Sequence, residues 1–241
     1  GYKPDYVVIT EPTNLAVYRG HRGRMEMKVV TKGRSCHASA PERGINAVVN
    51  MADIAKEVTA LDKRLKNDRF LGKGTVAVTK IECQTPSLNA VPDECTIYLD
   101  RRLTAGESMR LAVSQVARLP SVRKHKGKVE VLRYDAVAWT GLKVGQEKYY
   151  PTWLLPENHK LVRAAVNAAR IALRAEPKVD KWVFSTNGVA SAGRLGIPTV
   201  GFGPANEIYA HTVNEVMPVE HLLKAAVFYA ALPRFLAPGG T

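Results

Sequence analysis

One helical stripe, flanked by alternating segments, constrains this chain more than any other feature. From Ala47 to Leu65, apolar residues recur at intervals of four, three, four, three and four, as on one face of a helix of about twenty residues. Residues 24–29 alternate polar and apolar side chains ahead of it, as in a half-exposed strand. Further patterns follow: strands at 74–78 and 95–100, a helix over 107–119 and a strand at 128–131. The order predicts a split βαβ sandwich, one antiparallel sheet with two helices on one face.

The chain on either side of this module has a different character. Residues 6–9 form a short apolar run, which is typical of a strand buried on both faces of a parallel sheet. Beyond residue 140, helical stripes alternate with short apolar runs, at 161–173, 182–184, 197–202 and 219–235. We therefore predict an α/β protein in which residues 1–19 and 138–241 form an α/β domain. Residues 20–137 form an α+β (ferredoxin-like) domain inserted into it.

The composition of the chain limits the kinds of partner and compartment that we expect for it. Lysine and arginine outnumber aspartate and glutamate by 35 to 22, a net charge of +13. The basic residues lie in short clusters without the interleaved aromatic side chains that stack on bases, so we expect no nucleic acid. The sequence has no run of about 18 apolar residues that would predict a membrane span, and its first residues lack the pattern of a signal peptide, so we expect neither. Three cysteines without a CxxC pair fit a reducing compartment, so we expect a cytoplasmic protein without membrane association.

Two candidate residues come directly after predicted strands of the α/β part. Such folds place their ligand sites at the carboxyl ends of the strands. Glu11 comes just after the apolar run 6–9, although an ordinary loop glutamate would give the same pattern. His211 lies in a loop after residues 197–202 and is a candidate metal ligand; a hydrogen-bonded loop histidine is the alternative. No HExxH motif is present. We interpret four other histidines as structural or surface residues: His21, His125, His159 and His221.

Three more candidates lie in the inserted module. His37 follows a strand among small residues, which leave an imidazole uncovered; a capping or turn role is the alternative. Asn89 and Arg102 bracket the strand at 95–100, and an amide with a guanidinium can bind a carboxylate. The alternative for Arg102 and its neighbour Arg101 is a solvated surface pair.

A polar segment late in the chain is a weaker signal. Ser185, Thr186 and Asn187 precede Gly188 and can cradle an anion at a helix N-terminus, because Thr186 or Asn187 can cap the segment that follows. The sequence has no GxSxG, Walker A or GxGxxG motif, so it does not indicate a serine hydrolase or a nucleotide-binding protein.

Taken in order, these segments resemble the co-catalytic zinc metallopeptidase and aminoacylase family. The family includes acetylornithine deacetylase, succinyl-diaminopimelate desuccinylase and carboxypeptidase G, and the likeness is closest to a branch of hydrolases linked to selenium metabolism. The resemblance runs across nearly the whole chain. It is carried by residues 10–15, 18–23, 36–44, 90–92, 99–107, 184–189 and 210–215.

The resemblance implies a metal-dependent hydrolase, a peptidase or deacetylase, of an amide bond in an N-acyl amino acid or small peptide. Two metal ions, usually zinc, with cobalt or manganese as alternatives, would make a bound water the nucleophile. The resemblance implies that Glu11 is a ligand of one metal and His211 a ligand of the other. It also implies a catalytic α/β domain, and a lid domain at 20–137 that forms a homodimer.

The resemblance assigns the other candidates to catalysis and substrate binding. His37 would reach a neighbouring subunit's site and stabilise the tetrahedral oxyanion. Asn89 and Arg102 would bind the polar and carboxylate groups of the substrate. Ser185, Thr186 and Asn187 would form a loop beside the substrate.

The family's other ligands, a His-x-Asp, a bridging Asp and a Glu-Glu pair, come before the position of Glu11, and this chain has no counterpart of them. We therefore expect an incomplete or absent metal site and an inactive chain when it is alone, as the C-terminal part of a longer or cleaved protein or as a truncated form. The alternative functions are a non-catalytic dimerisation or binding module and, less favoured, a basic nucleic-acid-binding domain.

Overall fold

The computed structural model describes residues 3–237, and the chain divides into two compact units. The first unit consists of Gly1–Gly23, Arg69–Leu71 and Pro151–Thr241, and the second of Arg24–Asp68 and Gly72–Tyr150. The chain thus leaves the first unit, builds most of the second and returns. Each unit has its own sheets, helices and apolar core, so the predicted α/β fold class is confirmed.

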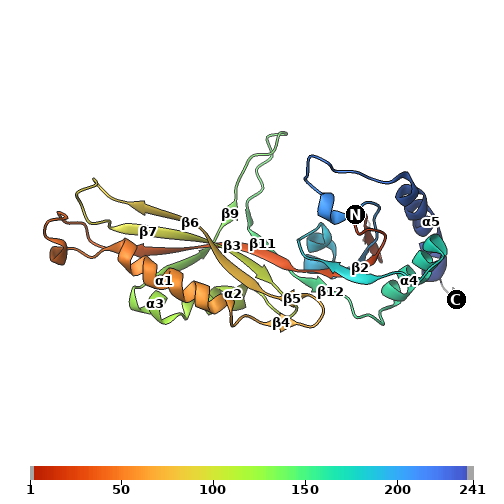
Figure 1. Ribbon diagram of the computed structural model, residues 1–241, viewed down its shortest axis with the longest axis horizontal. Helices are drawn as coiled ribbons and strands as arrows, with labels where there is room; N and C mark the ends of the chain where they lie inside the picture. The colour runs from red at the N-terminus through yellow and green to blue at the C-terminus, as the bar shows by residue number, and fades with distance from the viewer. Residues whose placement is uncertain (1–2, 238–241) are drawn as a thin grey trace. The chain divides into compact units, whose positions relative to one another are not determined.

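The second unit is built on an antiparallel sheet with helices on one face (Figure 1). Its long strands lie in the order β8-β3-β7-β6, and β11 also pairs with β3. This is the strand order of a split βαβ sandwich, as the sequence predicts. The strands are β3 (Gly23–Lys32), β6 (Thr75–Gln84), β7 (Glu94–Leu103), β8 (Lys128–Val131) and β11 (Tyr149–Tyr150), and the helices are α1 (Ala47–Asp62), α2 (Met109–Ala117) and α3 (Pro120–Lys124).

The core of this unit lies between the sheet and the helices. The predicted stripe of α1 is its centre, because Ala47, Met51, Ile54 and Val58 are all fully buried. Asn46 begins the helix: its Oδ1 accepts the amide hydrogens of Val48 and Val49. Against this stripe pack alternate residues of β7: Cys95, Ile97, Leu99 and Leu103.

Some boundaries differ from the expected ones. The helix expected over 107–119 is α2, which ends before Pro120 as predicted. A short helix that was not predicted, α3, follows it, because Pro120 occupies the first position of a helix, where its missing N–H costs nothing. The strand expected at 182–184 is β13 (Val179–Trp182). Short hairpin strands complete the second unit: β4 (Asn67–Asp68), β5 (Gly72–Lys73), β9 (Arg133–Tyr134) and β10 (Gln146–Glu147).

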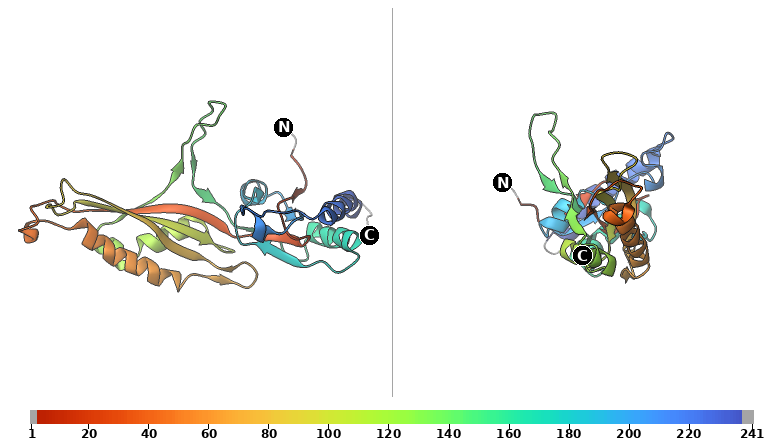
Figure 2. Two further views of the ribbon diagram at one scale, coloured as in Figure 1. Left: turned by 45° about the horizontal axis from the view of Figure 1, so that its top comes forward. Right: turned by 90° about the vertical axis from the view of Figure 1, so that its left-hand side faces the viewer.

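The β9–β10 hairpin leaves the second unit's sheet as an extended arm (Figures 1 and 2). A bridge between Val137 and Lys143 continues its ladder, and Gly141 turns the chain at a φ of +81°. Trp139 lies near its turn and is 98% exposed. Sequence patterning indicated only a loop here.

The first unit is a mixed sheet between helical layers. Its strand order is β1-β14-β2-β12, with β13 also paired to β2, and β1 is parallel to β14. One face packs against α4 and α5 through a core that contains Val17, Val200, Phe202 and Phe228. The elements are β1 (Val7–Ile9), β2 (Val17–His21), β12 (Trp153–Leu154), β14 (Thr199–Gly201), α4 (Lys160–Leu173), α5 (Val219–Leu236), η2 (Val189–Arg194) and η3 (Glu207–Tyr209).

Strand β2 had no clear sequence signal, because two of its five buried residues are polar. The structure shows their partners. Arg19 donates to the Leu155 carbonyl oxygen at 2.7 Å, and its guanidinium lies 3.7 Å from the centre of the Phe70 ring. His21 bonds through both ring nitrogens. No helix within residues 3–237 is long and apolar enough to cross a bilayer.

Candidate functional site

Glu11 and the start of the His211 loop meet at one edge of the first unit's sheet. β1 and β14 are parallel, so their carboxyl ends lie together, and Glu11 follows β1 by two residues with an exposed side chain. The chain after β14 touches this segment: the Gly203 N–H donates to Thr13 Oγ1 at 3.0 Å. A Cβ on Gly203 would lie 2.1 Å from the Glu11 carbonyl oxygen, so only glycine fits here.

His211 lies beyond η3 in an exposed loop before α5. Its φ of +64° is uncommon for a residue with a side chain and marks a constrained loop. The loop is anchored through η3, where the half-buried Glu207 carboxylate lies beside the buried Tyr18. Burial raises the pKa of Glu207, and burial beside this carboxylate raises that of Tyr18. Sequence reasoning missed this anchor, because nothing in the pattern around residue 207 separates it from a loop glutamate.

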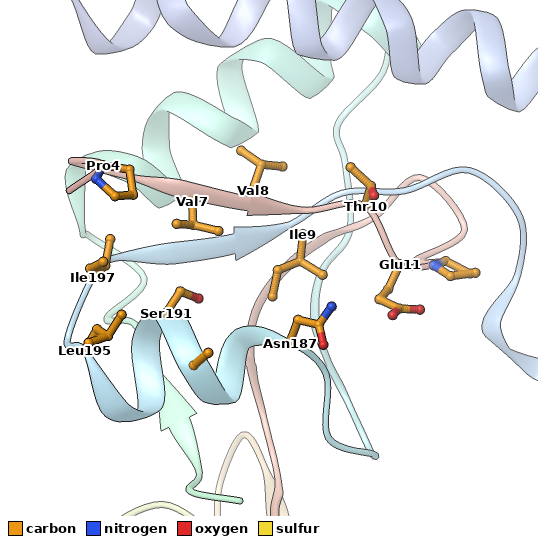
Figure 3. A pocket seen from close by; sticks show the side chains of 12 residues that line it. Pro4, Val7, Val8, Ile9, Thr10, Glu11, Asn187, Ser191, Leu195 and Ile197 are labelled. Carbon is orange, nitrogen blue, oxygen red and sulfur yellow. The ribbon is translucent and has the colours of Figure 1, made fainter. Parts of the chain in front are cut away.

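A groove of about 610 Å³ runs along β1 (Figure 3). Glu11 and Asn187 lie at one end of it, and Leu195 and Ile197 lie at the other. The groove therefore has a polar end at the carboxyl edge of the strands and an apolar end. It brings two of the predicted site residues, Glu11 and Asn187, to one cavity.

The polar segment 185–187 has divided roles. Thr186 is buried, and its N–H donates to His21 Nδ1 at 2.9 Å, while its Oγ1 accepts the Gly188 N–H at 3.2 Å. His21 therefore carries its proton on Nε2, which donates to the Pro151 carbonyl oxygen at 3.2 Å, and burial lowers the pKa of His21 to about 4. Ser185 bonds the Arg22 carbonyl oxygen, so only Asn187 of the three is exposed to a ligand.

In the second unit, the structure brings His37 and Asn89 together. His37 forms a bridge with Ala90, and the Ala38 N–H donates to the Asn89 carbonyl oxygen at 2.8 Å. The His37 ring is exposed, and its Nδ1 accepts the Ser39 N–H at 3.1 Å. In the neutral ring, Nε2 is consequently the nitrogen that carries hydrogen and donates outward.

Arg102 lies at the other end of β7 from this pair. From Glu94 to Arg102 the strand extends roughly 26 Å, at about 3.3 Å per residue. The guanidinium is half-buried and bonds Asp100 twice, from Nε at 2.7 Å and from Nη2 at 3.3 Å. Within one chain, Arg102 and His37 therefore cannot contact the same small ligand.

Arg101 is not the surface residue that its pairing with Arg102 suggested. It is 1% exposed and forms an ion pair with the equally buried Glu107, whose second oxygen accepts the Thr104 N–H at 2.8 Å. The alternation of the strand could have predicted that Arg101 is buried, because residue 101 shares a face with Leu99 and Leu103.

The donor set does not fit a zinc site made by this chain alone. Zinc sites in proteins use three or four protein ligands. Within residues 3–237, no group of three or more histidine, cysteine, aspartate or glutamate side chains is placed to hold a metal ion. Glu11 and His211 supply one donor each, and we derive no catalytic step through a metal.

Comparison with known proteins identifies the fold. Residues 19–128 match the M20 family's peptidase dimerisation domain, a range that contains β3, β6, β7 and the helices α1, α2 and α3 and ends at the first residue of β8. The chain is a relative of the M20 metallopeptidases. The resemblance to the co-catalytic metallopeptidase and aminoacylase family is thus confirmed.

The curated relatives are longer than this chain, which spans little more than half of their length. YgeY of Escherichia coli K12, an uncharacterized protein, is 48% identical over 233 residues, which cover 97% of this chain and 58% of YgeY. A succinyl-diaminopimelate desuccinylase of Rickettsia bellii is 24% identical over 93% of this chain and 54% of its own length. The aminopeptidase PepT of Bacillus cereus has the same fold, with a TM-score of 0.69 and 22% identity over 97% of this chain and 57% of PepT.

Proposed function

We propose that this chain is the dimerising and substrate-binding part of a hydrolase that cleaves an amide bond in an N-acyl amino acid or small peptide. The observation that carries the proposal is the pairing of His37 with Asn89 inside a peptidase dimerisation domain. The desuccinylase relative supports the substrate class by its name.

The chemistry proposed for this pair follows from its hydrogen bonds. His37 directs its Nε2–H outward, where it can donate to the oxygen that becomes negative when an amide carbonyl is attacked. Ser87 Oγ donates to Asn89 Oδ1, which leaves the Asn89 NH₂ group free to donate to a substrate oxygen. Both residues are thus donors toward an anionic or carbonyl ligand.

The separation of Arg102 from this pair supports a shared site. Because roughly 26 Å of strand lies between them, we propose that His37 and Asn89 serve a neighbouring subunit while Arg102 serves its own. Asp100 already occupies one edge of the Arg102 guanidinium, so a substrate carboxylate would bind its remaining N–H groups.

The first unit supplies the rest of the proposed site. We propose that the first unit is the catalytic α/β domain, which the sequence predicted as residues 1–19 and 138–241, and that the second unit is the lid, predicted as residues 20–137. We assign the polar end of the groove to substrate. Glu11 and His211 remain proposed ligands of two different zinc ions, whose further ligands lie outside the described residues. A cytoplasmic setting is proposed from the three free cysteines.

A second candidate is a non-catalytic dimerisation or binding module. It is favoured because this chain supplies only two metal donors, fewer than a zinc site uses.

The decisive experiment joins this chain to the part of E. coli YgeY outside the aligned 233 residues. Hydrolysis of N-acetyl and N-succinyl amino acids by the chimera, and its loss in His37→Ala but not in the neighbouring exposed Arg43→Ala, would support the hydrolase. Binding of these compounds without turnover by a folded, metal-loaded chimera would favour the module.

A further inference from the structure

Two of the three cysteines lie directly opposite each other on neighbouring strands of the second unit. In the antiparallel ladder of β6 and β7 (Figure 1), the register partner of Cys83 is Cys95. Opposed residues of such a ladder have Cα atoms about 4.5–5.5 Å apart and side chains on one face of the sheet. Because disulfides join cysteines whose Cα atoms lie about 4.4–6.8 Å apart, the backbone already holds this pair within bonding reach.

A bulge in β6 brings the two cysteines into register. The pairing of the two strands shifts by one residue between Val78 and Lys80. Without this shift, Glu82 would lie opposite Cys95, and the Cys83 side chain would point to the other face of the sheet. The pairing of the strands therefore creates this dithiol, and the spacing of the cysteines along the sequence does not indicate it.

The two thiols differ in their access to solvent. Cys83 is exposed, whereas Cys95 is fully buried in the second unit's core. Burial, with the neighbouring Cys83 as a second cause, raises the pKa of Cys95 to about 11. Reagents therefore reach Cys83 first, and Cys95 stays a protected thiol until its neighbour has reacted. The third cysteine, Cys36, is half-buried, and its Sγ donates to the Ala40 carbonyl oxygen at 3.4 Å.

The cysteine pair lies at the base of the connection that carries Asn89. Residues 85–93 join β6 to β7. Asn89 lies in this connection, and its neighbour Ala90 forms the bridge with His37. A bond between the two cysteines would close the connection into a covalent ring and remove part of its conformational freedom.

We propose that Cys83 and Cys95 form a reversible disulfide, which makes this strand pair a redox modification site. The oxidant is a small-molecule disulfide such as oxidised glutathione. The Cys83 thiolate attacks one sulfur of the oxidant, whose S–S bond breaks and releases one thiol, and a mixed disulfide remains on Cys83. Cys95 then gives its proton to solvent and attacks the Cys83 sulfur, which releases the second thiol. The protein loses two thiol hydrogens with their electrons, and the oxidant is reduced to two thiols.

The bond acts on the connection 85–93 and is not a permanent structural link. Disulfides in a reducing compartment are typically transient and redox-sensing, which fits the cytoplasmic setting proposed above. In the reduced chain the connection is held by its own hydrogen bonds, such as that from Thr85 Oγ1 to the Ser87 carbonyl oxygen at 2.8 Å. In the oxidised chain it is also closed at its base, so oxidation restricts the segment that presents Asn89.

The test exposes the 241-residue chain to mixtures of oxidised and reduced glutathione, blocks the remaining thiols with iodoacetamide and maps tryptic peptides by mass spectrometry. Residues 81–101 form one tryptic peptide that contains both cysteines, and Cys36 lies in another, 35–43. We expect the peptide 81–101 to lose two hydrogens and to escape alkylation, and dithiothreitol should reverse both effects. Oxidation should also slow hydrogen exchange in residues 85–93 and raise the melting temperature by roughly 5–10 °C.

Three variants separate the two steps of the reaction. Cys95→Ala should stop the reaction at the mixed disulfide, with glutathione retained on Cys83. Cys83→Ser should abolish oxidation of the peptide 81–101. The matched control Cys36→Ser should form the bond as the wild-type chain does. Circular dichroism establishes that each variant is folded.

Three results would overturn the proposal. One is a glutathione adduct that persists on Cys83 of the wild-type chain without closing to Cys95. Another is a disulfide between the Cys83 residues of two chains, which a gel without reductant shows as a covalent dimer. The third is alkylation of both cysteines across the whole range of glutathione mixtures. None of these readouts depends on hydrolysis or metal, so the redox proposal can fail while the proposed function stands.

Discussion

At the scale of single residues, two buried polar groups hold parts of the chain that carry candidate site residues. His21 lies under the segment 185–187, and the Arg101–Glu107 pair lies under the end of β7 that carries Arg102. Neither was indicated as functional by the sequence, and neither lines the groove along β1. Their role is to fix neighbours, and their energetics can be measured through folding.

His21 predicts a loss of stability in mild acid. Its pKa falls from 6.5 in the unfolded chain to about 4 in the folded protein because the ring is buried. Below pH 6.5 the unfolded state takes up a proton that the folded state does not, so the unfolding free energy decreases as pH falls toward 4. The expected decrease from this residue is about 2 kcal/mol between pH 7.5 and pH 5.

Urea unfolding of wild type and His21→Gln across this range is the measurement. The variant should be less stable at pH 7.5 and should have a shallower pH dependence. Parallel curves for the two proteins would show that His21 does not titrate as proposed.

The Arg101–Glu107 pair predicts a large cost when one partner is removed. Both side chains are 1% exposed, so Glu107→Gln leaves a buried guanidinium without its counter-charge. We expect a loss of about 3–5 kcal/mol in unfolding free energy. The double variant Arg101→Met/Glu107→Leu should recover most of it, and Lys80→Met, at an exposed ion pair, is the control. A loss below about 1 kcal/mol for Glu107→Gln would place the pair among weak surface bridges.

At the scale of elements, β6 is the edge at which we expect a second chain to pair. Among the described strands it pairs only with β7, and residues 77–84 are all exposed. An exposed edge of eight residues is a template for pairing with another chain. The α1 stripe is not available for this purpose, since it is buried in the unit's own core.

We therefore predict a homodimer through β6. Ile81→Glu should raise the dimer dissociation constant by at least about tenfold, because a charge on a paired edge costs about 1.4 kcal/mol or more. Val137→Glu, on the exposed β9–β10 arm, is the matched control. Sedimentation at micromolar concentration measures both, and a monomeric wild-type chain would contradict the prediction.

At the scale of the whole molecule, the count of donors predicts weak metal binding. Glu11 and His211 are two donors where zinc sites use three or four, so the 241-residue chain should lose zinc on dialysis. The chimera with the additional YgeY segment should retain about two zinc ions per chain if the two-zinc proposal holds. Metal analysis by mass spectrometry compares them. Two tightly bound zinc ions in the chain alone would show that the ligands were assigned wrongly.

Periodicity by itself determined most of the elements. The spacing of Ala47, Met51, Ile54 and Val58 marks the buried face of α1, and the order of strands and helices around it leads to the β8-β3-β7-β6 sheet. Local patterns succeed there because burial of one face imposes a fixed period on the sequence. They failed at β2, where buried Arg19 and His21 interrupt the apolar pattern and find their partners far along the chain.

Only the tertiary structure decided which candidates share a site. Asn187 joins Glu11 in one groove, and His37 joins Asn89 across a loop bridge, although more than fifty residues separate the members of each pair. Arg102, thirteen residues after Asn89, is carried away along an extended strand. The physical reason is that chain separation sets neither proximity nor exposure. Strand pairing decides which side chains meet, and the alternation of a strand decides that Arg101 is buried while Arg102 is partly open to solvent.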